Sequence, residues 1–229
     1  MARLPRLNLP DIPQHVIQRG NNRQACFISD RDYAVYLLKL KEYSKQFGVS
    51  IHAFVLMTNH VHLLVTPKEE GGVSQLMQAL GRYYVRYFNK RHKRSGTLWE
   101  GRFKASIIDS DRYFLVVSQY IELNPVRAKM VTHPANYTWS SFHFNGGGKL
   151  IKLIKPHDLY LALGATPQSR AKTYLSLFET ELPDFKINEI RCAVNSTRVL
   201  GSDVFKRQIE QQTGLTLIPN PWGGNRRIQ

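Results

Sequence analysis

The chain has 229 residues, 42% of them hydrophobic, which is enough for a full core and ordinary for a soluble globular protein. Its charge is unusual, because 32 Lys and Arg residues outnumber 17 Asp and Glu residues and leave a formal net charge of +15. This excess favours a polyanionic partner, and nucleic acid ahead of a membrane, because no apolar run approaches the roughly 20 residues that span a bilayer.

The cysteines and the N-terminus exclude several further classes of protein. Cys26 and Cys192 lie far apart and form no CxxC pattern, so neither a disulfide framework nor a zinc knuckle is indicated. Residues 1–12 read as a loose leader that prolines interrupt and that lacks the apolar core of a signal peptide. We therefore expect a protein of the reducing cytoplasm with no membrane segment.

A strand and a polar turn open the predicted fold. Residues 13–19 alternate between apolar and polar side chains as a strand does, and Gly20-Asn21-Asn22-Arg23 supplies residues typical of a turn. On a surface loop, the amides of Asn21 and Asn22 and the guanidinium of Arg23 could hydrogen-bond to the base edges of a nucleic acid. The same residues are also simply what turns are made of, so both interpretations stay open.

Two histidines mark the most chemically suggestive stretch of the chain. Two apolar strand segments, Phe54–Met57 and Val61–Val65, flank a short polar break. Because strand side chains alternate, His60 and His62 project from one face, roughly 6–7 Å apart along the chain. Two imidazoles on one rigid face are half of a metal site, although such a pair in an apolar strand is more often structural.

Helices are predicted on either side of this strand pair. The first runs from Arg31 to Phe47, and the second begins at Ser74 and carries an apolar stripe at every fourth residue. On another face of the second helix, Arg82, Arg86 and Lys90 recur at the same spacing. Like charges at this spacing repel, so the column is unfavourable in an isolated helix unless a polyanion lies along it.

The positive run continues beyond the second helix to Arg102 and Lys104. A charge run is usually just a solvated face. This one has a single sign almost throughout and is interleaved with Tyr83, Tyr87 and Trp99, whose rings could stack on unpaired bases. We therefore interpret it as a track for nucleic acid.

A strand at Phe103–Ile108 and a third helix at Arg112–Leu123 complete the pattern. The order strand, helix, strand, strand, helix, strand, helix is typical of a ferredoxin-like split βαβ fold of the α+β class, an antiparallel sheet with helices on one side. Tyr120 and Asn124 lie four residues apart on one face of the third helix, about 6 Å along its axis. Either residue alone would be read as structural.

The remainder reads as a helical C-terminal extension over residues 150–218. Gly146-Gly147-Gly148 is the clearest linker in the sequence. The expected helices are Leu159–Leu163, Arg170–Leu182, Lys186–Val194 and Asp203–Gln212. They could form a small DNA-binding module or a cap on the core, and residues 219–229 are expected to be a mobile tail.

Taken in series, these motifs resemble the single-tyrosine HUH transposases, and most closely the REP-associated tyrosine transposases of bacteria. The resemblance covers residues 12–145, which would be the catalytic domain. It rests on motifs that occur in the expected order, namely Val16-Ile-Gln-Arg-Gly-Asn-Asn-Arg23, His60-Val-His62, Leu98-Trp-Glu-Gly-Arg-Phe-Lys104, Tyr120-Ile-Glu-Leu-Asn-Pro-Val-Arg127 and Asn136-Tyr-Thr-Trp-Ser-Ser141.

The resemblance implies a chemistry for four residues. His60, His62 and Asn124 would hold a divalent metal that polarises a backbone phosphate of single-stranded DNA, and Tyr120 would attack that phosphate to give a 5′-phosphotyrosine. Insertion-sequence relatives commonly have glutamine as the third ligand, whereas this chain has Asn124. Imidazole favours transition metals while Mg²⁺ prefers oxygen, so Mg²⁺ and Mn²⁺ both remain open.

The implied function is DNA transposition in the bacterial cytoplasm, at the nucleoid. The substrates would be single-stranded or hairpin forms of palindromic repeats, read by phosphate contacts and, at the Asn21 turn, by base contacts. No nucleotide cofactor is expected, because cleavage conserves a phosphodiester and no nucleotide-binding glycine motif occurs. A monomer and a homodimer are equally open. The alternatives are a DNA-binding regulator without catalysis and a metal-dependent nuclease that uses water.

Overall fold

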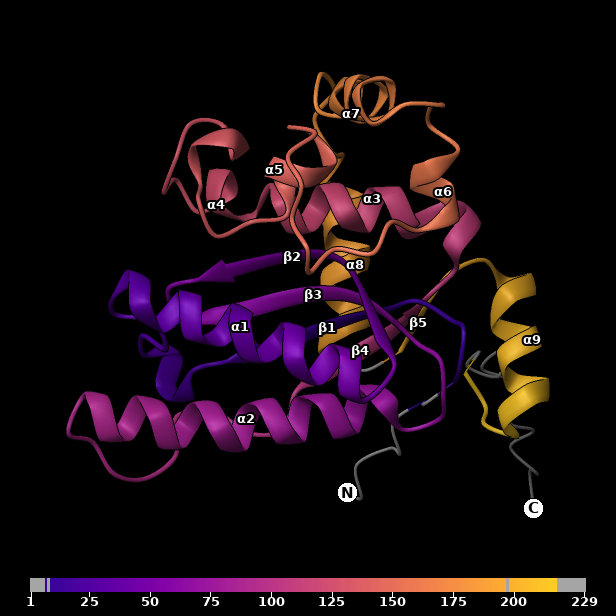
Figure 1. The fold of residues 1–229 in the computed structure, drawn as a ribbon. Helices are drawn as coiled ribbons and strands as arrows, with labels where there is room; N and C mark the ends of the chain where they lie inside the picture. The colour runs from indigo at the N-terminus through magenta and orange to yellow at the C-terminus, as the bar shows by residue number, and fades with distance from the viewer. Residues whose placement is uncertain (1–6, 8, 197, 218–229) are drawn as a thin grey trace, which may run out of the picture.

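The computed structural model describes residues 7, 9–196 and 198–217, and its first half follows the order of elements expected from the sequence (Figure 1). These elements are β1 (Gln14–Arg19), α1 (Asp30–Gln46), β2 (Val49–Met57), β3 (His60–Pro67), α2 (Gly72–Arg91), β4 (Lys104–Ile108) and α3 (Ser110–Glu122). Within the described ranges, no helix has the length and hydropathy to cross a membrane. The expected tail at 219–229 and most of the expected leader lie outside the described residues.

The strands form one sheet in the order β2-β3-β1-β4-β5, in which β5 is Val199–Leu200. Strand β1 lies between β3 and β4 and pairs antiparallel with both, as the split βαβ pattern predicts. The sequence did not predict β5, which adds a parallel pair with β4. In the register, Ile17 of β1 faces His62 of β3 on one side and Lys104 of β4 on the other, so these three side chains share one face of the sheet.

Both faces of the sheet are covered by helices, whereas the order of elements in the sequence predicted helices on one side only. Helices α1 and α2 pack on one face, where Leu63 and Leu80 are part of the core. Helices α3 and α8 (Asp184–Ser196) pack on the other face, with Leu64 and Ile190. Figure 1 shows α2 and α3 on opposite sides of the sheet. Consecutive apolar residues in β3 point to opposite faces, so each face needs its own layer of helices.

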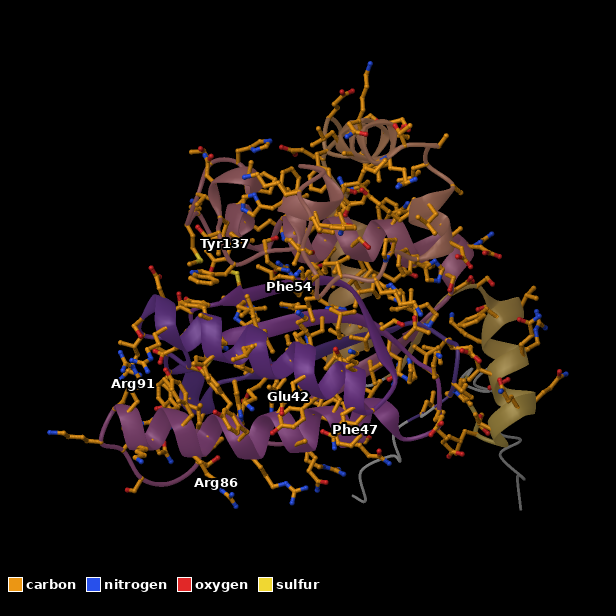
Figure 2. The ribbon with its side chains drawn as sticks, viewed as in Figure 1. Glu42, Phe47, Phe54, Arg86, Arg91 and Tyr137 are labelled. Atoms are coloured by element: carbon orange, nitrogen blue, oxygen red, sulfur yellow. The ribbon has the colours of Figure 1, made fainter. Side chains whose placement is uncertain are left out.

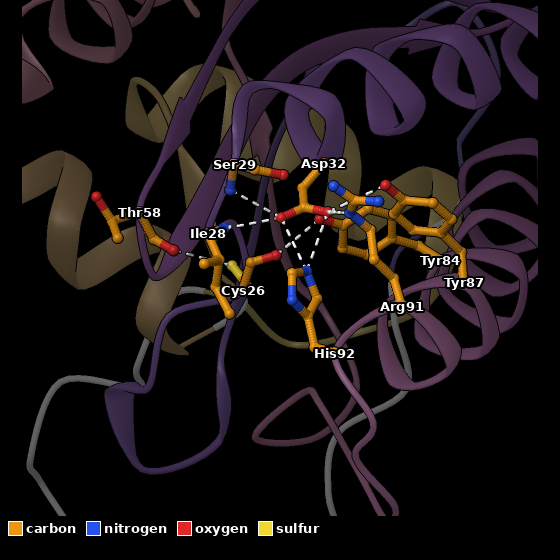
Figure 3. Close-up of polar contacts among 9 residues, drawn as sticks. All are labelled: Cys26, Ile28, Ser29, Asp32, Thr58, Tyr84, Tyr87, Arg91 and His92. Carbon is orange, nitrogen blue, oxygen red and sulfur yellow. Dashed lines mark hydrogen bonds and ion pairs between the residues drawn. The ribbon is translucent and has the colours of Figure 1, made fainter.

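A buried carboxylate joins the start of α1 to the end of α2 (Figure 3). Asp32 accepts hydrogen bonds from the backbone N–H groups of Ser29 and the residue before it, both at 2.9 Å, and from the Tyr87 hydroxyl at 3.1 Å. His92 Nε2 lies 3.1 Å and Arg91 Nε 3.7 Å from its oxygens. Burial raises the pKa of this carboxyl, but the hydrogen bonds outweigh burial and leave the pKa below its usual value.

The triglycine segment closes a short helix instead of acting as a flexible linker. Helix α5 (Phe142–Asn145) ends where the N–H groups of Gly146 and Gly147 both bond to the Phe142 carbonyl. A Cβ added at Gly146 would lie 2.9 Å from the Phe142 ring, so this turn needs a residue without a side chain. The chain then returns to the sheet, where Ile154 forms a bridge with Ile51 of β2.

The helices after this turn differ in extent from the sequence expectation. They are α6 (Asp158–Leu161), α7 (Pro167–Ser176), α8 and α9 (Asp203–Thr213). The expected helix Arg170–Leu182 instead begins at Pro167 and ends at Ser176. Its end is fixed by α3, because the Gln119 side chain donates a hydrogen bond of 2.5 Å to the Leu177 carbonyl.

A second buried carboxyl attaches α7 to α3. Glu122 accepts hydrogen bonds from Ser141 at 2.5 Å, from Asn145 at 2.7 Å and from the Tyr174 hydroxyl of α7 at 2.9 Å. Burial raises the pKa of this carboxyl to about 7. The C-terminal helices therefore contact the core directly, while the idea that residues 150–218 form a unit of their own stays a prediction.

Candidate functional site

The structure brings His60, His62 and Tyr120 together on the α3 face of the sheet. The two imidazoles come from neighbouring same-face positions of β3, with ring centroids 4.9 Å apart and planes at 73°. The Tyr120 ring reaches them from α3, with its centroid 5.9 Å from that of His62. The side chains that the sequence placed on one face of a strand and on one face of a helix therefore meet at one site.

Hydrogen bonds orient both imidazoles. His60 Nδ1 donates to the Asn59 side-chain oxygen at 2.6 Å, which leaves its Nε2 lone pair unengaged. His62 Nδ1 lies 2.8 Å from Nε2 of His15, a residue of β1 that the sequence analysis did not single out. His15 is fully buried and its ring centroid is also 5.8 Å from that of Tyr120. The sequence offered one signal for the orientation of His15. It lies two residues before Ile17 in an alternating strand, so the two side chains point to the same face of the sheet.

All three histidines are held in the neutral form. Burial, and secondarily the charge of Arg19, lowers the pKa of His60 to about 4. Burial also lowers the pKa of His62 well below its usual value, with added effects from His60, His15 and Arg127. The pKa of His15 falls to about 3 for the same reason. A metal-ligating histidine must be neutral, so His60 and His62 meet that requirement at neutral pH.

Asn124 stands at the first position of α4 (Asn124–Arg127), directly after α3. Its side-chain nitrogen donates to the carbonyls of Tyr120 at 3.0 Å and Ile121 at 3.2 Å. These two bonds fix the amide orientation and leave its oxygen as an acceptor. Within the described ranges, no cluster of three or more His, Cys, Asp and Glu side chains could hold a metal. Imidazole nitrogens and an amide oxygen are donor types that suit a divalent ion, and a shared site for His60, His62 and Asn124 stays a prediction.

Arg127, at the end of α4, lies against the candidate nucleophile. Its guanidinium carbon is 4.3 Å from the centroid of the Tyr120 ring, and its Nη2 donates to the Tyr120 carbonyl at 2.5 Å. In the sequence, Arg127 closes the motif that begins at Tyr120, and the motif alone indicates no role for it. The structure makes it a direct neighbour of Tyr120.

The sequence model of the IS200-like transposases matches residues 9–124 of this chain. The chain belongs to the IS200-like transposase family. A search of curated proteins finds no match to it.

Comparison with solved structures shows which proteins share this fold. A REP-associated tyrosine transposase bound to a REP hairpin is 18% identical to this transposase, with a TM-score of 0.53, and the match covers 69% of this chain and 93% of that one. A candidate transposase from Deinococcus radiodurans is 23% identical, with a TM-score of 0.37 and coverage of 53% and 96%. The first of these shares the α+β architecture of the transposase described here.

The arginine column of the transposase does not lie beside Tyr120. Arg82, Arg86 and Lys90 are exposed on α2 and line a groove with Tyr43 of α1 and Tyr87. Figure 2 shows Arg86 on the side of α2 that points away from the sheet. Tyr120 packs on the opposite face, so the sheet separates this groove from the candidate site. A DNA contact at the column stays a prediction.

One aromatic member of the expected track is not available for base stacking. Trp99 is buried, and its ring packs in the core against Tyr84 and Tyr36, with centroid distances of 6.0 and 6.5 Å. The expectation was wrong for this residue, because its ring belongs to the hydrophobic core between the sheet and helices α1 and α2. Tyr83, by contrast, is 38% exposed.

The Asn21–Arg23 turn lies next to the candidate site. It forms a short 3-10 segment in which Asn22 and Arg23 are exposed. Asn59 connects it to the histidines, because its side-chain nitrogen donates to the Arg23 carbonyl at 3.2 Å while its oxygen accepts from His60.

Two further predicted contacts follow in the chain. Arg102 is exposed in the segment before β4. Lys104 shares the face of His62, and its ammonium group lies 3.3 Å from the Asn195 side-chain oxygen of α8. The positive run is therefore divided between two faces of the transposase, and its direct contact with DNA stays a prediction.

Proposed function

We propose that this transposase cuts and rejoins single-stranded DNA through a covalent bond between Tyr120 and a 5′ phosphate. The observation that carries the proposal is the convergence of one phenol and two neutral imidazoles, with Tyr120 and His62 centroids 5.9 Å apart. Membership of a transposase family supports strand cleavage and joining as the reaction class. The proposed site of action is the bacterial cytoplasm.

In the proposed step, the phenolic oxygen of Tyr120 forms a bond to phosphorus and the bond from phosphorus to the 3′ oxygen breaks. The phenol loses its proton and the 3′ oxygen gains one. The product keeps one phosphodiester as a phosphotyrosine, so attack by a 3′ hydroxyl can reverse the reaction without a nucleotide cofactor. Packing of the Tyr120 ring against His62 and His15 restricts the direction of attack.

We assign His60, His62 and the Asn124 oxygen to the binding of Mg²⁺ or Mn²⁺. Such an ion, when bound, supplies Lewis-acid polarisation of the phosphate. The contribution of the chain is to keep the ligands neutral and oriented. The Asn59 oxygen fixes the ring of His60, the His15 nitrogen fixes that of His62, and two helix carbonyls hold the amide of Asn124.

We propose hairpin-forming palindromic repeats as the DNA substrate. A solved structure with the same fold is a REP-associated tyrosine transposase bound to a REP hairpin, which makes such DNA the first class to test. Near the site, we assign base contacts to the Asn21–Arg23 turn and a phosphate contact to Lys104. Arg102 and the α2 column of Arg82, Arg86 and Lys90 would contact phosphates farther from Tyr120.

A labelled-DNA experiment tests the function. Hairpin oligonucleotides labelled at the 5′ or the 3′ end are incubated with the protein and Mn²⁺ or Mg²⁺ and analysed on a denaturing gel. We expect a protein-linked band that carries the downstream fragment and that disappears with a chelator and in Tyr120→Phe.

Other outcomes identify the alternatives. Cleavage that persists in Tyr120→Phe without an adduct would indicate a nuclease that uses water. Tight binding without cleavage of any hairpin would instead indicate a DNA-binding regulator.

A further inference from the structure

Arg127 is held in contact with Tyr120 from two directions. Helix α4 follows α3 so closely that Arg127 reaches back to donate from Nη2 to the carbonyl of Tyr120 at 2.5 Å. At the same time its guanidinium carbon lies 4.3 Å from the ring centroid of the same residue. These contacts fix the position of the positive charge relative to the candidate nucleophile.

Two donor nitrogens of this guanidinium have no partner within the described part of the chain. Arg127 Nε and Nη1 are shielded from solvent and make no hydrogen bond to any described residue. A buried donor without an acceptor costs free energy, and the cost is larger when the donor is charged. Among the described residues, the acceptors that Arg127 contacts both belong to Tyr120, namely its backbone carbonyl and its side chain, and no carboxylate pairs with the guanidinium.

The surroundings of Arg127 are positive. Within the described residues, no carboxylate forms an ion pair with it. Burial, and less strongly the charge of Arg191 on α8, lower the pKa of the Arg127 guanidinium to about 10, against an opposing effect of Tyr120. The charges of Arg127 and Arg19 are also among the causes that lower the pKa of His62. Arg19 of β1 thus acts on the two histidines, and Arg191 of α8 acts on Arg127.

A purely structural arginine would be expected to have an acidic partner, as Arg91 has in Asp32. The contacts with the ring, the side chain and the carbonyl of Tyr120 explain the position of Arg127, but they leave Nε and Nη1 without an acceptor among the described residues. An anion placed at Tyr120 would supply the missing acceptor. Guanidinium donors match the oxygens of a phosphate in both charge and geometry.

We propose that Arg127 is a catalytic residue that binds the scissile phosphate at Tyr120 through its free donors. This inference rests on the proposed function. As Tyr120 bonds to phosphorus and the 3′ oxygen leaves, negative charge grows on the non-bridging oxygens, and Arg127 stabilises it. The proton transfers are those of the proposed step, and Arg127 itself remains protonated throughout.

The test measures the single-turnover rate of adduct formation on the hairpin that the wild-type protein cleaves. We expect Arg127→Ala to lower this rate about 100- to 1,000-fold, the usual cost of losing one transition-state donor, and Arg127→Lys to lose less. Affinity for the same hairpin, measured by fluorescence anisotropy with a chelator present, is expected to change less than about 5-fold. The control is Arg112→Ala, an exposed arginine at the other end of the same helix pair.

A second substrate separates catalysis from structure. A methylphosphonate at the cleaved linkage removes the negative charge that Arg127 would bind, so the rates of wild type and Arg127→Ala should then differ by less than about 10-fold. A loss of equal size on both substrates, or a rate within about 3-fold of wild type on the phosphodiester, would overturn the proposal.

The same assay distinguishes this proposal from the function on which it rests. If the wild-type protein forms no adduct with any hairpin, the proposed function is rejected, and the proposed role of Arg127 is rejected because it depends on that function. If the wild type forms the adduct and Arg127→Ala forms it equally fast, only the role of Arg127 is rejected.

Discussion

At the scale of single residues, the hydrogen bond between His15 and His62 determines which nitrogen of His62 is free. If His62 Nδ1 carries the proton and donates to His15 Nε2 across 2.8 Å, the Nε2 lone pair of His62 is left for a metal. The reverse tautomer would place a proton on that nitrogen and block it. A bound ion therefore selects the first arrangement, and His15 is the acceptor that makes it possible.

Replacement of His15 should consequently weaken metal binding. We expect His15→Ala to lower the affinity for Mn²⁺ about 10- to 100-fold, the usual effect of removing a residue that orients a ligand. His15→Gln should lose less, because its amide oxygen can still accept from His62. Titration calorimetry of the protein with Mn²⁺, without DNA, measures the effect. His52→Gln, a buried histidine elsewhere in the sheet, is the control, and unchanged affinity in His15→Ala would reject the role.

The role of His15 could not be predicted from the sequence. From its neighbours Gln14 and Val16 alone, a functional histidine at position 15 is indistinguishable from one that is merely buried, and the register that places it in the strand beside His62 is a long-range property. His60, His62 and Tyr120 could be found because they belong to recognisable motifs. The partners that orient them come from other elements, and no local pattern encodes those contacts.

At the scale of elements, Asp32 should contribute to stability by joining α1 to α2. Asp32→Asn keeps the shape of the side chain and one oxygen for the backbone N–H groups, but it replaces the oxygen that accepts from Tyr87 with an NH₂ donor and removes the negative charge that faces Arg91. We expect a loss of about 2–4 kcal/mol in the free energy of unfolding, measured by urea denaturation at pH 7. Asp30→Asn, an exposed residue of the same first turn, should lose less than about 1 kcal/mol.

Asp32 should also make the free energy of unfolding depend on pH. The pKa of the Asp32 carboxyl is lowered in the folded protein, so its stabilising effect is fully present above the unfolded-state pKa of about 3.9. The effect is lost as the pH falls through the folded-state pKa. Wild type and Asp32→Asn should therefore converge in stability under acid, and a constant difference down to pH 2 or so would contradict this assignment.

Many of the elements were predictable, because apolar periodicity marks α1 and α2, alternation marks β1, and apolar runs mark β2 and β3. The misreadings occurred where tertiary contacts overrode local pattern. The triglycine turn at 146–148 is packed against Phe142, and α7 ends at Ser176 because α3 binds the next carbonyl. The two-residue strand β5 is too short to carry a period of its own.

At the scale of the whole molecule, the positive charge lies on two faces that the sheet separates. Turn Asn21–Arg23 and Lys104 belong to the side of the candidate site, whereas Arg82, Arg86 and Lys90 line the groove on the outer side of α2. A hairpin that contacted both faces would have to pass around an edge of the sheet. The α2 column should then contribute to affinity without contributing to chemistry.

A triple variant tests whether the α2 column contributes to DNA affinity but not to the rate of the reaction. We expect Arg82→Ala, Arg86→Ala and Lys90→Ala together to weaken hairpin binding and to reduce the slope of log affinity against log salt by about 2–3, the value for that number of phosphate contacts. The rate of adduct formation at saturating DNA should remain that of wild type, because the column lies across the sheet from Tyr120. The matched control removes the same charge from three exposed lysines, Lys149, Lys152 and Lys172. Equal losses of affinity in the two variants would mean that net charge, and not the groove on α2, attracts the DNA.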